Sequence, residues 1–487
     1  MATKVEYAKA NKKPNIFVRF FSGIGNWFVE FGKRFSDGSI GTKLSHFIFG
    51  AGNFYHGQIL KGIMYLAIQV GIILFMVLCP EVNRTPYGYK ALMNLGLWGE
   101  GKTIFNPETY EMVIGDNDQL KLLFGLVTIA VCIIYVLVWL SNIKSSFKAD
   151  NDVKQGKKAT TFGQDVADLF DTRFHLLMLT PTMVAALIFS LLPTIFMICI
   201  AFTGYNDLDM SAAQTQLFTW NGFDNFIAMF TGSSSLGLEI QARFLPVLAW
   251  TVVWAILATL TCYFGGILLA ILINKKGLKF KKVFRVFFVI SIAVPQFISL
   301  LAVRELFNEY GPVNDLLKNL GWITESIKFF GIGEGANEYV AKVMVIIVNM
   351  WLGVPYTMLM TSGILLNIPA DLYEAGTVDG ASKTKMFWKI TLPYVIFVTT
   401  PYLISSFIGN INSFNTIFLL TGGYPEVPGY KAGGTDLLVT WLYKLTIDNG
   451  EYNTGAVIGI ITFIITSVIT LIAYTNSKAY NEEDTFQ

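Results

Sequence analysis

Polar side chains within an apolar stretch near residues 392–413 are the groups best placed to bind a ligand. Ser406, Asn410 and Ser413 stand at i, i+4 and i+7, which predicts that they share one face of a helix. Their hydroxyl and amide groups both donate and accept hydrogen bonds, as the hydroxyls of a sugar require. Such groups are costly among apolar residues unless they are paired or face water, so they predict a pathway for a polyhydroxy ligand. The alternative is that they only hold helices together.

Tyr356, in a neighbouring apolar segment, could complete such a site. Its ring and hydroxyl offer a flat apolar surface with a polar edge, which suits a pyranose ring. Gly353 and Pro355 lie beside it and are expected to open that helix locally.

A match to a nucleotide-binding motif is present but weak. Gly96, Gly101, Lys102 and Thr103 fit the spacing GxxxxGK[ST] of a phosphate-binding loop. That loop needs a preceding buried strand and a following helix, so that backbone N–H groups surround the phosphate. The residues before Gly96 do not read as a strand, and Pro107 follows soon after. We therefore predict no nucleotide site here and expect another chain to supply any energy.

Cysteines and histidines predict no metal centre. The cysteines lie far apart in apolar runs and read as small buried hydrophobic residues; they are Cys79, Cys132, Cys199 and Cys262. The histidines show no ligand spacing; they are His46, His56 and His175. The sequence predicts no catalytic residue, no metal and no cofactor in this chain.

Composition predicts an all-α, polytopic membrane protein with about eight transmembrane helices. Of the 487 residues, 53% are hydrophobic and only 14% are charged, against about 25% charged in soluble domains. A spanning helix needs about 20 largely apolar residues. The segments that qualify are Gln58–Cys79, Leu120–Leu140, Leu176–Phe202, Val247–Asn274, Val283–Val303, Lys342–Leu366, Leu392–Asn410 and Thr454–Thr475.

The distribution of positive charge predicts the orientation. The sharpest basic cluster lies between two spans and comprises Lys275, Lys276, Lys279, Lys281, Lys282 and Arg285. Because cytoplasmic loops are enriched in Lys and Arg, this turn, the N-terminal tail and residues 144–173 are predicted to be cytoplasmic. Both termini are then cytoplasmic in a multi-pass membrane protein.

Aromatic residues before the first span recur at helical spacing. They are Phe17, Phe20, Phe21, Ile24, Trp27, Phe28, Phe31 and Phe35, and Arg19, Lys33 and Arg34 flank them. The pattern predicts a basic amphipathic helix on the inner membrane face, with a helix packed against the spans as the alternative. The predicted domains are a cytoplasmic tail with this helix (1–56), two helices and a cytoplasmic linker (57–175), a six-helix core (176–475) and a cytoplasmic tail (476–487).

The polar loop at 367–393 has the pattern of a helix–turn–helix. Asp371 suits the N-terminal end of a first short helix, and Gly380 suits its end because glycine accepts a left-handed conformation. A second amphipathic helix is predicted to run into the next span, with Pro393 early in that span, where its missing N–H costs little. Such an element on the cytoplasmic face is predicted to dock a partner.

This loop resembles the EAA loop of bacterial ABC importer permeases. The residues that carry the resemblance are Glu374, Ala375, Gly376, Gly380, Ile390, Leu392 and Pro393, with Asp379 just before the turn. Gly376 stands where alanine is usual. The resemblance implies the six-helix permease core (MetI-like fold) and a loop that inserts into an ATPase subunit, with Glu374 and Gly380 as coupling residues. ATP would then be bound by the partner ATPase subunits, and the chain would lie in the bacterial cell membrane.

The stretch from Ala201 to Tyr205 and the segments 412–423 and 434–439 extend the resemblance to carbohydrate permeases of the maltose/maltodextrin (MalF-like) group, over about residues 176–475. It implies a sugar-import subunit, not an enzyme, that works with a second permease, two ATPase subunits and an extracytoplasmic sugar-binding protein. The positions that match the sugar contacts of that group are Leu352, Gly353, Tyr356, Ser406 and Asn410. Gly409 and Ser413 replace an aromatic residue and an asparagine, which leaves the exact sugar open.

Two other classes are weighed against this one. An ion-coupled secondary transporter of a small polar solute predicts buried ionisable residues in the spans and an inverted repeat, and the spans are almost free of carboxylates. A membrane-anchored scaffold or sensor predicts a sizeable soluble domain, and no segment between the spans is long enough.

Overall fold

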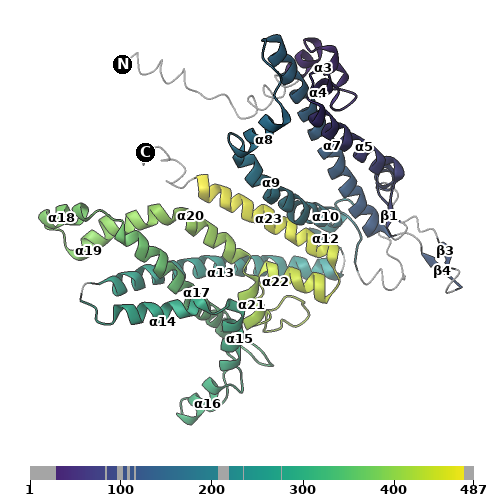
Figure 1. The fold of residues 1–487 in the computed structure, drawn as a ribbon. Helices are drawn as coiled ribbons and strands as arrows, with labels where there is room; N and C mark the ends of the chain where they lie inside the picture. Colours follow the sequence, from purple (N-terminus) through teal and green to yellow (C-terminus); the bar gives the residue numbers. More distant parts are fainter. Residues whose placement is uncertain are drawn as a thin grey trace, which may run out of the picture. The chain divides into compact units, whose positions relative to one another are not determined.

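The computed structural model describes residues 29–82, 85–95, 103–106, 110–114, 117–206, 219–233, 235–275 and 277–475. The chain folds as two compact units (Figure 1). Unit 1 comprises Met1–Met197 with Gln214–Thr219, and unit 2 comprises Ile198–Ala213 with Trp220–Gln487. The domain boundary expected from the sequence lies between residues 175 and 176, and it stays a prediction.

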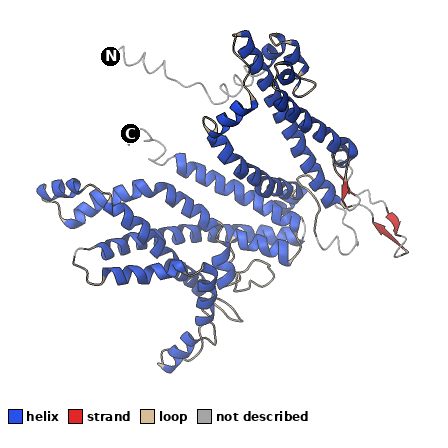
Figure 2. Cartoon of the chain, in the orientation of Figure 1, coloured by secondary structure: helices blue, strands red, loops and turns tan. Residues whose placement is uncertain are grey.

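Unit 1 is built on two long helices and several short elements. Its helices are α3 (Ile40–Leu44), α4 (Ala51–Tyr55), α5 (Ile59–Leu78), α6 (Tyr89–Asn94), α7 (Asp118–Lys154), α8 (Phe162–Phe170) and α9 (Phe174–Ala186). Helix α9 leads through the π-turn η1 (Leu187–Leu191) into α10 (Leu192–Ile200), whose last three residues belong to unit 2. Two antiparallel pairs, β1 (Glu81–Val82) with β2 (Thr85–Pro86) and β3 (Thr103–Asn106) with β4 (Glu111–Ile114), are the strands of the described chain (Figure 2).

Buried polar contacts hold α3 and α4 to the polar end of α7. Asn142 accepts from the N–H of Gly50 at 2.8 Å, and the hydroxyls of Ser45 and Ser146 lie 2.9 Å apart. These side chains are fully buried. Because buried polar groups are stable only when they are hydrogen-bonded, this network fixes the short helices on α7.

The N-terminal amphipathic helix falls largely outside the described residues, which include none of its members before Val29. Residues 29–36 are helical. The Phe31 ring lies 5.4 Å from that of Trp139 on α7, and the Phe35 ring lies 5.1 Å from that of His46. This part of the helix packs against the span α7 through Phe31, which is the arrangement that the alternative expected. The placement of the helix on a membrane face stays a prediction.

Unit 2 is a helical assembly. Its elements are α12 (Asp224–Thr231), α13 (Ser235–Asn274), α14 (Lys281–Ala293), α15 (Gln296–Leu306), α16 (Pro312–Asn319), α17 (Glu338–Leu366), α18 (Ala370–Val378), α19 (Lys383–Met386), the π-turn η2 (Phe387–Thr391), α20 (Leu392–Ile411), α21 (Phe414–Leu420), α22 (Leu438–Tyr443), the π-turn η3 (Lys444–Asp448) and α23 (Tyr452–Thr475). Helices α13, α17 and α20 pack against one another, and α20 also contacts α23 (Figure 1).

Seven helices of the described chain are long and apolar enough to cross a membrane. They are Ile59–Leu78, Asp118–Lys154, Phe174–Ile200, Gly237–Asn274, Glu338–Leu366, Lys383–Ile411 and Tyr452–Thr475. The predicted span Val283–Val303 is instead a bent pair, Lys281–Ala293 and Gln296–Leu306, which meet at 96°. Counting that pair as one gives the predicted eight. The bend follows from Pro295, because a proline disfavours helical backbone at the residue before it, and Val294 is extended.

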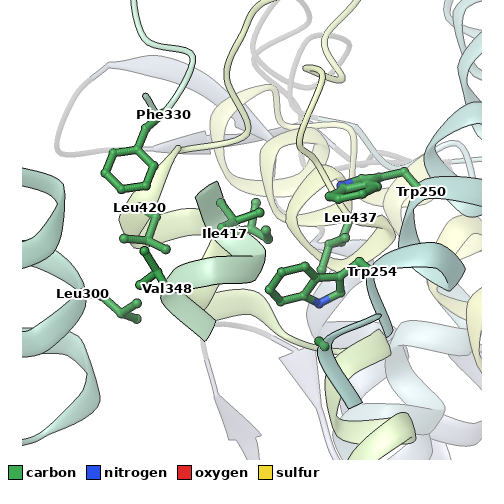
Figure 3. Close-up of a cluster of buried hydrophobic side chains, with 10 residues drawn as sticks. Trp250, Trp254, Leu300, Phe330, Val348, Ile417, Leu420 and Leu437 are labelled. Carbon is green, nitrogen blue, oxygen red and sulfur yellow. The ribbon is translucent and has the colours of Figure 1, made fainter. Parts of the chain in front are cut away.

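The core of unit 2 gathers around α21. Ile417 and Leu420 of α21 belong to one buried cluster, with Leu300, Val348 and Phe330 on one side and Trp254 and Leu437 on the other (Figure 3). All of these side chains are buried. Because burying a large apolar side chain contributes about 1.5–3 kcal/mol, this cluster fixes α21 between α13, α15 and α17.

Glycines allow α13 and α17 to approach closely. A Cβ on Gly266 would lie 2.4 Å from the Cβ of Thr357, and one on Gly353 would lie 2.5 Å from the Sγ of Cys262. Small residues give this kind of close packing between membrane helices. The two helices run in the same direction, since Asn274 near the end of α13 donates to Ser362 near the end of α17 at 2.9 Å.

We expect Gly266→Val to separate α13 from α17. Overpacking of this kind costs about 1–3 kcal/mol, which should lower the midpoint of thermal unfolding measured on the purified complex in detergent. Gly363→Val is the matched control, because a Cβ at Gly363 of α17 meets nothing within 4 Å. Equal midpoints for the two variants would contradict the close approach.

Candidate functional site

The loop at 367–393 folds into a helix–turn–helix, as predicted. α18 follows Pro369 and ends at Asp379, and Gly380 then adopts φ +70°. The N–H of Gly380 donates to the carbonyl of Thr377 at 3.0 Å, and the N–H of Ala381 donates to that of Gly376 at 2.9 Å. This pattern satisfies the last carbonyls of α18 and requires the left-handed residue that glycine supplies.

The second helix is continuous with a membrane span. Ser382 caps α19 by accepting from the N–H of Lys385 at 3.2 Å, and the helical run then extends from Lys383 to Ile411. Pro393 lies inside this longer helical run and in the first turn of α20, early in the span as predicted. The π-turn Phe387–Thr391 precedes it, and a wider turn accommodates a proline ring and its missing N–H.

Contacts inside the loop make it one rigid element. The hydroxyls of Tyr373 and Thr391 lie 2.8 Å apart and join α18 to the second helix. A Cβ on Gly376 would lie 3.4 Å from both Ile390 and Met386, so the alanine usual at this position fits with little adjustment. The loop therefore moves as a unit with the start of α20.

The predicted coupling residues divide between the surface and the interior. Glu374, Ala375, Asp379 and Gly380 are exposed. Leu392 is buried and packs with Val395 of α20 against Tyr263 and Ile267 of α13. The exposed group also includes large apolar side chains that sequence reasoning did not single out: Leu372, Val378 and Trp388, of which Val378 is 88% exposed. Exposed apolar side chains that gather in one place mark a site of interaction with a protein or a membrane.

The loop and the basic turn Lys275–Arg285 lie at the same end of unit 2, which we call the α18 end (Figure 1). The Arg285 guanidinium donates to Asn274 at 3.3 Å, and Asn274 in turn donates to Ser362. The two segments that were predicted to be cytoplasmic therefore share one end. Which side of the membrane this end faces stays a prediction.

Asn410 lies on α20 and contacts α13. Its side-chain Nδ2 donates to the hydroxyl of Thr259 at 2.9 Å, and its backbone carbonyl accepts from the Nε1 of Trp254 at 3.1 Å. The amide therefore has an interhelical partner, which is what the helix-holding alternative expected. One amide oxygen and a second N–H remain for a ligand, so this geometry fits both roles.

Ser413 does not share a helical face with Ser406 and Asn410, and that part of the prediction is wrong. α20 ends at Ile411, and Ser413 is the first residue before α21. Its hydroxyl donates to Thr416 at 3.1 Å. Asn412 and Ser413 separate the two apolar helices α20 and α21. The helix breaks there because polar side chains of this kind compete for backbone hydrogen bonds.

Tyr356 and Tyr402 form an aromatic pair between α17 and α20. Their ring centroids lie 5.9 Å apart, Tyr356 is 54% exposed, and the Tyr402 hydroxyl lies 3.3 Å from that of Thr357. Sequence reasoning missed Tyr402, although it stands one helical turn before Ser406. Helices α17 and α20 run in opposite directions. Leu352, one turn before Tyr356, therefore lies at the same level along the two helices as Ser406, one turn after Tyr402.

Residues 352–355 have mainly packing roles in this structure. Leu352 packs against the core cluster, and Gly353 faces Cys262 of α13. Pro355 is buried within a continuous α17, so the expected local opening of that helix is wrong. In contrast, a Cβ at Gly409 on α20 meets nothing within 4 Å, which leaves open space where the resembled group has an aromatic side chain.

The remaining motifs add no site to the described chain. Gly96, Gly101 and Lys102 lie outside the described residues, and Thr103 begins the strand β3. All four cysteines are free. No group of three or more His, Cys, Asp or Glu side chains in the described residues could hold a metal ion.

Comparison with known proteins agrees with this architecture. Residues 263–479 match the family described as binding-protein-dependent transport system inner membrane component. The chain is 33% identical over 442 residues to the galactooligosaccharides transport system permease protein GanP of Bacillus subtilis, covering 89% of this chain and 96% of that protein. It is 30% identical over 446 residues to the maltodextrin transport system permease protein MalC of Streptococcus pneumoniae, covering 89% and 95%.

The match to MalF is shorter. The chain is 37% identical over 259 residues to the maltose/maltodextrin transport system permease protein MalF of Escherichia coli, which covers 52% of this chain and 48% of that protein. Among solved structures, it is similar in fold to a bacterial ABC transporter involved in the import of the acidic polysaccharide alginate, with TM-score 0.52, 23% identity, and coverage of 65% of this chain and 99% of that one.

The fold and these relatives define a multi-pass membrane permease of the carbohydrate ABC importer class. The chain belongs to the family of binding-protein-dependent transport system inner membrane components, and the resemblance to carbohydrate ABC importer permeases is confirmed. It is a transporter subunit and not an enzyme. The 442-residue match is longer than the stretch 176–475, so it also includes part of the chain before residue 176.

Proposed function

We propose that this chain forms half of the translocation pathway of an ATP-driven importer of a neutral oligosaccharide of the maltodextrin type. Its partners would be a second homologous permease, two cytoplasmic ATPase subunits and an extracytoplasmic binding protein. The names of the MalC and MalF relatives support a maltodextrin. The GanP relative supports a galactooligosaccharide as a second candidate. A related structure, of an alginate transporter with TM-score 0.50, contains a pentasaccharide-bound periplasmic protein.

The observation that carries the proposal is the helical run Lys383–Ile411. It holds the exposed turn of the loop at one end and Asn410 at the other. Near its start, Leu392 and Val395 pack against α13, and further along the hydroxyls of Tyr263 and Thr399 lie 2.6 Å apart. A displacement of α18 by a bound ATPase would therefore shift the whole run against α13 and reshape the polar region around Tyr356, Ser406 and Asn410.

The arrangement of charge supports this mechanism over ion-coupled transport. The described residues include five buried charged side chains. Asp118, Lys121 and Asp150 lie near the two ends of α7, and Asp436 and Glu451 lie between α21 and α23, so none lies in α13, α17, α20 or α23. Ion-coupled transporters rely on ionisable groups within their spans. Free energy for uphill transport is then expected from the ATPase partners, which dock on exposed Glu374 and its apolar neighbours.

Uptake by reconstituted vesicles tests the function. We expect vesicles that contain both permeases, the ATPases and the binding protein to accumulate radiolabelled maltotriose only when ATP is supplied on the ATPase side. A parallel assay with β-1,4-galactotriose decides between the two substrate candidates. Uptake driven by a proton or sodium gradient without ATP would overturn the proposal.

A further inference from the structure

A pocket of about 590 Å³ lies at the end of unit 2 opposite α18. It is formed by the segment between α21 and α23 and by α21 itself. Its lining combines aromatic rings with carboxylate and amide groups, among them Phe418, Tyr424, Tyr430, Glu426, Asp448 and Asn449. Small-molecule sites commonly have volumes of about 300–1,000 Å³, so the pocket is large enough to hold a ligand.

A buried ion pair gives the pocket a fixed wall. Asp436 is fully buried, and Lys444 donates to it at 2.7 Å. The carboxylate also accepts from the N–H of Gly433 at 2.7 Å and from the hydroxyl of Thr440 at 2.9 Å. Gly423 passes so close that a Cβ there would lie 2.1 Å from the carboxylate. A buried charge with all its partners in place is costly to rearrange, so the loop is held in one conformation.

Two side chains of α13 fasten the other wall. Glu239 accepts from the N–H of Lys431 at 2.5 Å. The Arg243 guanidinium donates to the carbonyl of Gly433 at 3.4 Å and lies 5.5 Å from the centre of the Tyr430 ring. The pocket is thus tied to the same helix that packs against α20.

An aromatic stripe joins the pocket to the end of α20. The rings of Phe414 and Phe418 are stacked at 4.8 Å, and the ring of Tyr443 lies 5.0 Å and 5.2 Å from them. Phe418 lines the pocket. Phe414 is four residues after Asn410 and directly follows Ser413. Flat aromatic surfaces of this kind pack well against the apolar faces of pyranose rings.

We propose that this pocket binds a neutral oligosaccharide before it enters the membrane site, and that the stripe Phe414–Phe418–Tyr443 guides it there. This proposal rests on the proposed function. Aromatic rings supply stacking surfaces, and Glu426, Asp448 and Asn449 supply hydrogen-bond acceptors and a donor for sugar hydroxyls.

The charges around the pocket favour a neutral sugar over an acidic one. Both lysines of the lining are paired with carboxylates: Lys444 with Asp436, and Lys431 with Glu451 at 3.8 Å. Glu426 and Asp448 line the same pocket and are exposed. Like charges would repel a uronate carboxylate, so the pocket selects against acidic saccharides.

Equilibrium dialysis and uptake together test the pocket. The probe is radiolabelled maltotriose, measured on the complete complex in nanodiscs without binding protein, in an Asn410→Ala background that weakens the membrane site. We expect the remaining binding to fall by roughly three- to tenfold on Tyr424→Ala, the range that loss of one stacking partner gives. In the otherwise native complex, the same substitution should raise the KM for uptake by a similar factor while kcat changes little.

Tyr339→Ala is the matched control, because Tyr339 lies in the first turn of α17, is 76% exposed and does not line the pocket. Glu426→Gln, at an exposed position, should strengthen binding of a trimeric uronate because it removes one of the two carboxylates that would repel it. Unchanged maltotriose binding in Tyr424→Ala would overturn the proposal, as would unchanged uronate binding in Glu426→Gln. Loss of binding-protein-stimulated ATP hydrolysis with unchanged maltotriose binding would assign the pocket to protein docking instead. Should wild-type vesicles fail to take up any sugar, the importer function fails separately, since dialysis does not depend on uptake.

Discussion

Gly380→Pro is expected to abolish ATP-driven uptake while saccharide binding to the permease persists. Gly380 has φ +70°, whereas a proline ring fixes φ near −65° and removes the N–H. That N–H donates to Thr377 at 3.0 Å and helps to end α18. A misplaced proline costs about 3 kcal/mol or more, so the turn must rearrange and α18 loses the orientation in which it presents Glu374.

The measurements are uptake, ATP hydrolysis and retention of the ATPase on the purified permease. We expect uptake to fall by more than about tenfold, the change that 1.4 kcal/mol gives, together with loss of the ATPase or hydrolysis that no longer responds to sugar. Gly376→Ala is the matched control in the same helix, because its Cβ lies at ordinary contact distance from Ile390 and Met386. Normal uptake in Gly380→Pro would refute the coupling role of this turn.

A second variant separates coupling from local folding. Glu374 is exposed on α18, so Glu374→Ala leaves the helix intact and removes only the carboxylate. The same loss of coupled uptake is expected, with unchanged thermal stability of the permease. A Glu374→Ala protein that transports as well as the native chain would remove Glu374 from the interface.

Local sequence signals predicted the helix–turn–helix well, because each of its features depends on neighbours in the chain. Asp371 in the first turn of α18 and the left-handed glycine at Gly380 both act within a few residues. The apolar segments likewise predicted the spans, since length and hydropathy alone decide whether a helix can cross a bilayer.

Breaks inside apolar segments were harder to predict. Hydropathy averages over about 20 residues, so it joined the two arms of the bent pair at Val294–Pro295 into one span. The span predicted as Leu392–Asn410 ended within one residue of α20, but the helical spacing was carried past that end to Ser413. Pro295 was a usable signal, because proline restricts the preceding residue.

Pairings between distant segments were beyond sequence reasoning. The hydrogen bond from Asn410 to Thr259 and the contact of Gly353 with Cys262 depend on how α13, α17 and α20 pack. Periodicity shows which residues share a face of one helix, but it does not show which helix that face meets. The role of Asn410 therefore turns on a partner that only the structure supplies.

That partner allows the two roles of Asn410 to be separated by experiment. Asn410→Ala removes both the amide and its bond to Thr259, whereas Thr259→Val removes the bond and keeps the amide. If the amide binds sugar, we expect Asn410→Ala to raise the KM for maltotriose uptake about tenfold or more, as expected when a buried polar contact of about 1–3 kcal/mol is lost.

Under the same hypothesis, Thr259→Val retains most of the uptake, because the side-chain amide of Asn410 is still present and can bind the ligand. Assembly with the ATPases and the midpoint of thermal unfolding report on packing in both variants. A matching loss of uptake and of stability in Asn410→Ala and Thr259→Val would show that the amide only holds α20 to α13. The distinction is measurable because the hydroxyl of Thr259 is buried between the helices, where it reaches Asn410 but contributes little to a ligand.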